Sequence, residues 1–83
     1  MYSVYVLYSR SHDLYYKGMT ENLARRLEQH NQGTLGRFTK NKGPWELVYY
    51  EQYESKTQAL KREKYFKTGV GREFLKSVIK KKK

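Results

Sequence analysis

The segment 22–31 contains two side chains that could bind a phosphate group and carry a proton. Arg26 and His30 lie four positions apart, so they share one flank if the segment is helical. At 100° per residue, three apolar residues occupy one arc of that helix: Leu23, Ala24 and Leu27. Arg25 points away from this arc, so we expect it to face solvent. We expect Arg26 and His30 either to line a cleft beside the core or to be ordinary residues at the core boundary.

Glu63 is a carboxylate at an apolar position of a second helical segment, residues 55–67. Three residues define the apolar arc of that segment: Ala59, Leu60 and Phe66. Glu63 falls near the middle of the arc, whereas its basic neighbours fall outside it or at its margins: Lys61, Arg62 and Lys64. A carboxylate that faces a core is costly unless it is paired or binds a metal. Glu63 is therefore either the partner of an Arg or a Tyr, or the ligand of a divalent cation in a cleft. A shifted helix boundary would remove the anomaly.

Tyrosine is the third residue type with chemical potential, and the chain has nine of them. Tyrosines in strands mostly serve packing, so their number alone indicates no site. Tyr5 and Tyr16 would share one face of a hairpin only if its register pairs residues of opposite parity. The connector between the two strands does not decide that register.

Six elements are expected to position these side chains. Three segments rich in β-branched and aromatic residues predict strands: residues 1–8, 14–18 and 45–50. The first is apolar on both faces, which predicts a central strand. Three segments predict helices: residues 22–31, 55–67 and 73–79.

Local signals set the expected boundaries of these elements. Thr20 or Asn22 can cap the first helix, and residues 55–58 fit a capping box for the second. Gly69 and Gly71 are expected to interrupt the chain before the last helix. Residues 32–44 contain three Gly and the Pro, which predicts a loop. The order β-β-α-β-α-α predicts a small α/β or α+β domain, with a three-stranded antiparallel sheet flanked by helices.

Positive charge dominates the composition. The chain has 18 Lys and Arg against 8 Asp and Glu, a formal net charge of +10. Residues 61–83 hold 10 basic and 2 acidic residues, so they carry +8 of it. The run ends in four lysines: Lys80, Lys81, Lys82 and Lys83. Such a segment attracts a polyanion, of which nucleic acid is the commonest in cells, and a merely solvated tail is the alternative.

Composition also excludes several classes of protein. Without Cys, the chain has no disulfide scaffold, thiol nucleophile or Cys-type zinc site, and two His cannot form a His-rich metal site. No apolar run approaches the roughly 20 residues of a membrane span, and the N-terminus does not resemble a signal peptide. We expect a cytoplasmic protein with no membrane partner. With 83 residues, one domain over residues 1–79 and a basic tail over 80–83 are expected.

Five chemistry-bearing residues occur in an order and spacing that resemble the stand-alone GIY-YIG nuclease domains: Tyr5, Tyr16, Arg26, His30 and Glu63. Residues 3–5 and 16–18 match the two tripeptide motifs of that family, and the resemblance covers essentially the whole chain. The chain is also similar to the N-terminal nuclease domain of the excinuclease C subunit. Ser3 replaces the Gly of the first motif and Lys17 an Ile-like residue of the second, while Met19 stands where some members have Lys.

The resemblance implies a metal-dependent endonuclease that hydrolyses phosphodiester bonds, with DNA favoured over RNA as the substrate. Glu63 would hold one Mg²⁺ or Mn²⁺ ion, and Arg26 would hold phosphate oxygens. Tyr5 or Tyr16 would orient or deprotonate the attacking water, and His30 would orient a Tyr or act as a second proton carrier. Lys17 and the four terminal lysines would bind the nucleic-acid backbone.

Other interpretations remain open at the level of the sequence. Relatives with defined substrates usually carry additional domains, so a protein partner could supply the specificity of this chain. The main alternative function is a non-catalytic nucleic-acid-binding module that retains the fold. An interaction domain without nucleic acid would leave the basic segment unexplained. The oligomeric state is not predicted.

Overall fold

A computed structural model describes residues 1–33 and 42–79 of the chain. Most of the predicted loop at 32–44 and the four terminal lysines lie outside the described residues. Within the described ranges, no helix is long and apolar enough to cross a membrane.

Three strands form one antiparallel sheet: β1 (Tyr2–Ser9), β2 (Leu14–Thr20) and β3 (Trp45–Tyr53). The strand order is β2-β1-β3, so the predicted central position of the first strand is confirmed. Residues 3–7 of β1 are all buried, because helices cover both faces of this strand. The predicted fold class, a three-stranded antiparallel sheet with three helices, is also confirmed.

The register of the β1–β2 hairpin places the two motif tyrosines on one face. Tyr5 lies opposite Gly18, and Leu7 lies opposite Tyr16. Each pair joins an odd-numbered with an even-numbered residue, which is the parity that a shared face requires. Even-numbered residues of β1 therefore face the other side of the sheet.

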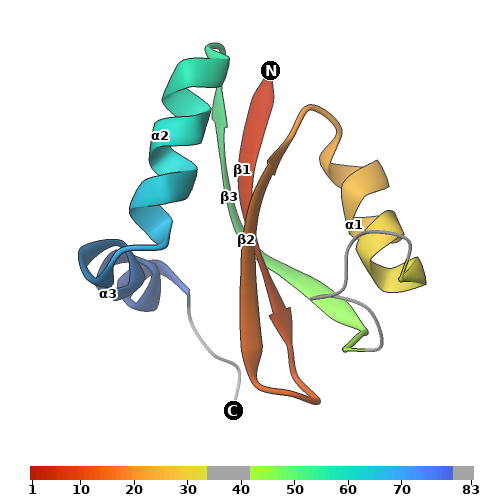
Figure 1. Ribbon diagram of the computed structural model, residues 1–83. Coiled ribbons are helices and arrows are strands. Elements are labelled where there is room, and N and C mark those ends of the chain that lie inside the picture. The colour runs from red at the N-terminus through yellow and green to blue at the C-terminus, as the bar shows by residue number, and fades with distance from the viewer. Residues whose placement is uncertain (34–41, 80–83) are drawn as a thin grey trace.

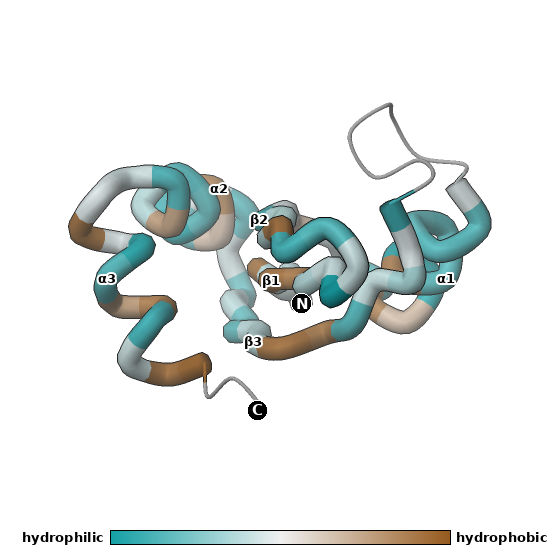
Figure 2. Tube along the Cα trace, turned by 90° about the horizontal axis from the view of Figure 1, so that it is seen from below, coloured by the Kyte–Doolittle hydropathy of each residue, from teal (hydrophilic) through white to brown (hydrophobic). Residues whose placement is uncertain are grey.

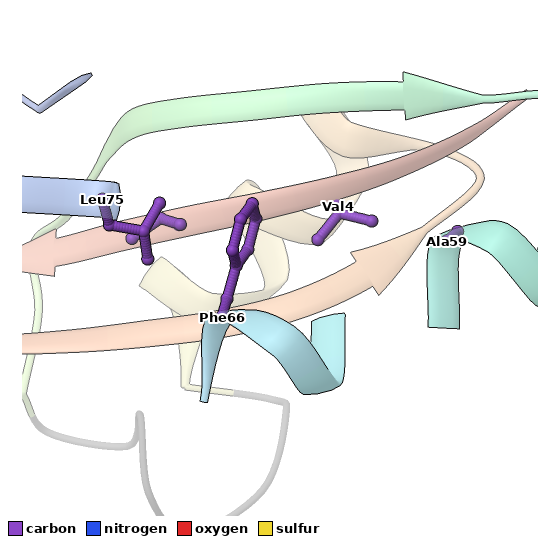
Figure 3. Close-up of a cluster of buried hydrophobic side chains, with 5 residues drawn as sticks. Val4, Ala59, Phe66 and Leu75 are labelled. Atoms are coloured by element: carbon purple, nitrogen blue, oxygen red, sulfur yellow. The ribbon is translucent and has the colours of Figure 1, made fainter. Parts of the chain in front are cut away.

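The two faces of the sheet carry separate hydrophobic clusters. The helix α1 (Leu23–Gln32) covers one face, whereas α2 (Lys56–Phe66) and α3 (Gly69–Val78) cover the other (Figure 1). On the α1 face, the buried members are Tyr5, Leu7 and Trp45. On the opposite face, they are Val4, Val6, Ala59, Phe66 and Leu75 (Figure 3). Seen from below, β1 lies between the helices of the two sides (Figure 2).

The helix caps agree with the sequence patterns. Asn22 caps α1 by accepting a hydrogen bond from the backbone N–H of Arg25. Gly33 ends α1 with φ 73°, a left-handed conformation that glycine adopts without a Cβ clash. Ser55 caps α2 by accepting from the backbone N–H of Gln58.

The predicted interruption at Gly69 and Gly71 is wrong, because α3 begins at Gly69. Thr68 caps this helix and accepts a hydrogen bond from the backbone N–H of Gly71. Gly71 is buried, and a Cβ atom at this position would overlap the carbonyl of Tyr65. The glycine therefore allows α3 to approach the end of α2 and does not break a helix.

Two predicted apolar positions are also corrected. Ala24 is exposed on α1, whereas the other two residues of the predicted apolar arc, Leu23 and Leu27, pack against the sheet. Leu60 is 38 % exposed on α2. The half-buried Arg62 occupies the inward position instead, with its guanidinium 4.7 Å from the ring centroids of Tyr65 and Phe74.

Candidate active site

Tyr5 lies at the centre of the candidate site. Its side chain is completely buried, on the sheet face covered by α1. A Cβ atom at Gly18, directly across on β2, would lie 2.5 Å from Tyr5 Oη. The absence of a side chain at Gly18 therefore makes room for the phenol, which gives the glycine of the second motif a packing role.

His30 is the hydrogen-bond partner of this phenol. Its side chain is buried in the last turn of α1, and Nε2 lies 3.0 Å from Tyr5 Oη. Burial, and then the nearby charge of Arg26, lower the pKa of His30 below its usual value. The imidazole is therefore neutral at neutral pH, and its tautomer decides which group donates in the bond to Tyr5.

Side chains from three other elements act on the Tyr5 phenol. Burial is the main cause that raises the pKa of Tyr5 to about 12, and Tyr16 on β2 adds to the rise. Arg26 on α1 opposes it through its charge and hydrogen bonding, whereas the negative charge of Glu63 on α2 adds to it. Arg26 and Glu63 are both half-buried. Glu63, 58 positions from Tyr5 in the sequence, is thus close enough for its negative charge to act on the phenol.

Tyr16 completes an aromatic group around His30. The centroid of its half-buried ring lies 4.8 Å from the His30 ring and 6.3 Å from the Tyr5 ring. Trp45, at the start of β3, packs against the edge of the same ring at 6.4 Å. These contacts hold Tyr16 beside His30 and Tyr5.

A groove of about 440 Å³ lies next to Arg26. It is formed by the end of β2 and the first turns of α1 and α2. Three of its lining residues are cationic: Arg25, Arg26 and Lys56. Glu21 is the acidic residue of the lining. The excess of positive charge suits a phosphate backbone that approaches the site from this side.

Glu63 is the carboxylate whose charge acts on Tyr5. Within residues 1–33 and 42–79, no three His, Cys, Asp or Glu side chains lie together as a metal-binding group. Mg²⁺ retains several waters and is commonly bound through one or two carboxylates together with substrate phosphates. Mn²⁺ shares this preference for carboxylate and water. The donor set therefore fits a hydrated divalent ion held by one carboxylate.

Lys17 and Met19 lie on the opposite face of the sheet from Tyr5. Lys17 pairs with Val6 and Met19 with Val4, two residues of the cluster beneath α2 and α3. Met19 packs against that cluster. The structure thus brings together Tyr5, Tyr16, Arg26 and His30, and the charge of Glu63 acts on Tyr5 from α2, whereas Lys17 lies elsewhere.

Two structural features of the site were not predicted. Asn31, next to His30, bonds both backbone polar groups of Trp45, accepting from its N–H at 2.5 Å and donating to its carbonyl at 3.2 Å. Arg62, next to Glu63, donates to both carboxylate oxygens of Glu51, at 2.8 and 3.1 Å. These two contacts fix the helices that carry His30 and Glu63 to β3.

The GIY-YIG catalytic domain family matches residues 1–75 of the chain. The chain belongs to this family. Among other members, it is 42% identical over 64 residues to the UPF0213 protein CPE1444 of Clostridium perfringens, a match that covers 77% of this chain and 68% of that protein. A UPF0213 protein of Staphylococcus aureus is 45% identical over 53 residues, which is 64% of this chain and 65% of the relative.

A solved GIY-YIG relative has the same fold. The solution NMR structure of the UPF0213 protein BH0048 from Bacillus halodurans superposes with a TM-score of 0.55 at 30% identity. The alignment covers 93% of this chain and 84% of that one. The resemblance inferred from the ordered motifs is therefore confirmed at the level of family and fold. The matched curated relatives extend beyond the aligned segment, which spans about two thirds of their length.

Proposed function

We propose that the protein is a metal-dependent endonuclease that hydrolyses phosphodiester bonds in DNA. Membership of the GIY-YIG catalytic domain family points to nuclease chemistry. The observation that carries the proposal is the set of side chains around Tyr5. One buried phenol is bonded to His30 and is influenced by Tyr16, Arg26 and Glu63, which come from three further elements. A purely structural tyrosine needs one hydrogen-bond partner, but it does not need charged side chains from two further elements.

The two tyrosines have different roles in the proposed mechanism. Because burial raises the pKa of Tyr5 to about 12, this phenol stays protonated at neutral pH and is a poor base. It positions His30 and Tyr16 through the contacts described above. Tyr16 is half-buried and is therefore the tyrosine that orients the attacking water, and it takes the proton of that water as its own phenolic proton passes to His30. The neutral imidazole of His30, 4.8 Å from Tyr16 between ring centroids, serves as a further proton carrier.

Arg26 and Glu63 act on the phosphate. The planar guanidinium of Arg26 binds two non-bridging oxygens and stabilises the charge that develops on them. Glu63 holds the divalent ion, Mg²⁺ or Mn²⁺, which when bound supplies Lewis-acid stabilisation of the phosphate and the leaving oxygen. The groove lined by Arg25 and Lys56 holds the adjoining backbone without reading bases.

Glu63→Gln tests the proposed function directly. The substitution keeps the shape of the side chain and removes the charge that binds the cation. With supercoiled plasmid and branched DNA as substrates, and RNA for comparison, we expect the wild type to cleave DNA in Mg²⁺ or Mn²⁺. We expect no cleavage with chelator and background cleavage by the variant. Binding to DNA should persist or tighten, because a negative charge near the phosphate is removed.

The exposed Glu54 offers a matched control, and Glu54→Gln should retain cleavage. If Glu63 were a structural ion-pair partner, Glu63→Gln would lower the melting temperature and leave metal-dependent cleavage in place. That result would contradict the metal-ligand assignment. Binding without cleavage by the wild type, with every metal and substrate, would identify a nucleic-acid-binding module instead.

A further inference from the structure

A second groove lies on the face of the sheet opposite the candidate active site. It has a volume of about 430 Å³ and is formed by β2 and α3. Its lining residues are Tyr15, Lys17, Arg72, Leu75, Lys76 and Ile79. Half of these are cationic and half are apolar or aromatic. The volume falls in the range of sites that enclose small ligands.

Two of the three positive charges of this groove, those of Lys17 and Arg72, lack acidic partners in the described part of the chain. Lys76 forms an ion pair of 3.6 Å with Glu73, and both side chains are about three-quarters exposed. No described acidic residue forms an ion pair with Lys17 or Arg72. Burial, followed by the charges of Arg72 and Lys67, lowers the pKa of Lys17. The cationic side chains of the groove therefore repel one another, and an anionic ligand would relieve this repulsion.

The remainder of the groove is suited to a flat, weakly polar group. Tyr15 packs beside Tyr8 with ring centroids 4.8 Å apart, which fixes the orientation of its ring. Leu75 is buried and Ile79 is half-buried, and together they form an apolar floor. A nucleotide matches this groove in two parts. Its phosphate suits the cationic side chains at the rim, and its base suits the apolar floor, because every base has a face that packs on aromatic and apolar side chains.

The position of the groove connects it to the active site. Lys17 lies between Tyr16 and Gly18 on β2, and successive residues of a strand point to opposite faces. Because β2 is at the edge of the sheet, a strand of nucleic acid can pass around it from one face to the other. A base in a duplex is stacked and paired, so it cannot enter a groove of this kind without being extruded. An unpaired base enters without that cost.

We propose that the groove between β2 and α3 binds an unpaired nucleotide of the substrate strand, with its phosphate at Lys17 and Arg72 and its base against Tyr15 and Leu75. This inference rests on the proposed function and adds a substrate class to it. The enzyme selects DNA in which an unpaired segment adjoins the cleaved bond, such as a flap or a branch.

Binding of a mononucleotide tests the groove without requiring catalysis. Adenosine monophosphate is titrated into ¹⁵N-labelled protein, in parallel with adenosine and with inorganic phosphate. We expect shifts of the backbone amides of Tyr15, Arg72 and Leu75, and weaker binding of the two fragments than of the nucleotide. Arg72 is exposed on α3, so Arg72→Ala should fold normally. It should weaken nucleotide binding about tenfold, the loss expected for one charge-assisted contact.

Lys61→Ala removes one positive charge from an exposed position of α2 and is the matched control. Equal weakening by both variants would show attraction by net charge alone and would overturn the site. Shifts confined to the groove beside Arg26, or phosphate binding as strong as nucleotide binding, would also overturn it.

Cleavage then tests the substrate class. Two DNA substrates of equal duplex sequence are compared, one flush and one with a short single-stranded flap. The wild type should cut the flap substrate faster, and Arg72→Ala should bring the ratio of the two rates toward one. An unchanged ratio in the variant contradicts the inference. If neither substrate is cut in any metal, the proposed function fails, while the nucleotide titration still decides whether the groove is a site.

Discussion

The chemistry of Tyr5 depends on how completely the protein surrounds it. A buried phenol requires a hydrogen-bond partner, and His30 supplies it at 3.0 Å. The same burial raises the pKa of Tyr5 to about 12 and lowers that of His30. Both groups are therefore held in their neutral forms at neutral pH. The pair is a rigid, uncharged support for the more exposed Tyr16.

Gly18→Ala tests this arrangement by adding a single carbon atom next to the Tyr5 phenol. The added Cβ would lie 2.5 Å from Tyr5 Oη, and the side chain of Tyr5 is completely buried. We expect the free energy of unfolding to fall by about 1–3 kcal/mol, the usual cost of overpacking, and cleavage to fall with it. Urea unfolding and a cleavage assay measure the two effects.

Gly69→Ala is the control for this change. Nothing lies within 4 Å of a Cβ atom at Gly69, the first residue of α3. This variant should be neutral, or more stable by up to about 1 kcal/mol. Full stability and activity in Gly18→Ala would mean that Tyr5 is not confined as described.

Arg26 and Arg25 are adjacent in sequence and line the same groove, but they should differ in their contribution to catalysis. Arg26 is half-buried and acts on Tyr5, whereas Arg25 is exposed. Arg26→Ala should lower kcat about 10²–10³-fold, as for the loss of one preorganised donor to a developing negative charge. Arg25→Ala should weaken DNA binding and leave kcat nearly intact. Equal loss of kcat in both variants would show that α1 presents a different face to the substrate.

The sequence could predict some of these residue positions and not others. Arg26 and His30 follow from the period of one helix, and the structure places both beside Tyr5. The need for glycine at Gly18 arises from a side chain on the neighbouring strand, which no local pattern contains. Arg62 shows the same limitation, because its partner Glu51 lies on β3, 11 residues away.

At the scale of elements, hydrogen bonds between one side chain of α1 and the backbone of β3 hold the helix against the sheet. Asn31, near the end of α1, accepts a hydrogen bond from the backbone N–H of Trp45 at the start of β3 and donates one to its carbonyl. Trp45 itself is buried and packs against Tyr16. The orientation of the helix that carries Arg26 and His30 is thus coupled to the strand that supports Tyr16.

Asn31→Ala should separate these two elements. The backbone N–H of Trp45 would lose its partner in a part-buried position, which costs about 1–3 kcal/mol in the free energy of unfolding. Denaturant unfolding measures this loss. Gln32→Ala removes only an exposed hydrogen bond to Glu28 and should change stability by less than about 0.5 kcal/mol. An equally small effect of Asn31→Ala would contradict the coupling.

Element boundaries were predictable where the capping residue itself bonds the helix. Asn22 and Ser55 do so, and both helices begin directly after them. The start of α3 was not predictable from Gly69 and Gly71, since glycine is read from sequence as a breaker. Here Gly71 is needed because the backbone of Tyr65 approaches too closely for a Cβ atom. Glycine occurs both where two helices pack closely and where a helix is broken, so the residue type alone does not distinguish the two.

At the scale of the whole molecule, two separate cationic grooves adjoin β2, one at the end of the strand and one between the strand and α3. One is lined by Arg25, Arg26 and Lys56, and the other by Lys17, Arg72 and Lys76. Nucleic acid that contacts both must release several counterions, so binding should weaken steeply as salt rises. The excess of positive charge in the sequence predicted a polyanion as partner, but it could not predict two grooves, because their residues are joined only by the fold.

Deletion of residues 80–83 should change affinity and not turnover. Each lysine that neutralises a phosphate adds about −0.9 to the slope of log affinity against log salt concentration for duplex DNA. We therefore expect a shallower slope for the truncated chain and unchanged cleavage at saturating DNA. Binding isotherms at several salt concentrations measure the slope. An identical slope before and after truncation would show that these lysines do not contact the backbone.

The alternation along β1 restricts how the gene can change in length. Tyr5 and Val6 are neighbours that serve opposite sides of the sheet, one beside His30 and one beneath α2 and α3. Loss or gain of one codon within this strand would exchange the two sides, putting Tyr5 into the cluster beneath α2 and α3 and Val6 into the site. We expect either single change to disrupt the site, and only a second, compensating change would restore the alternation of the two faces. We therefore expect changes of length to be tolerated in the hairpin turn and not within β1.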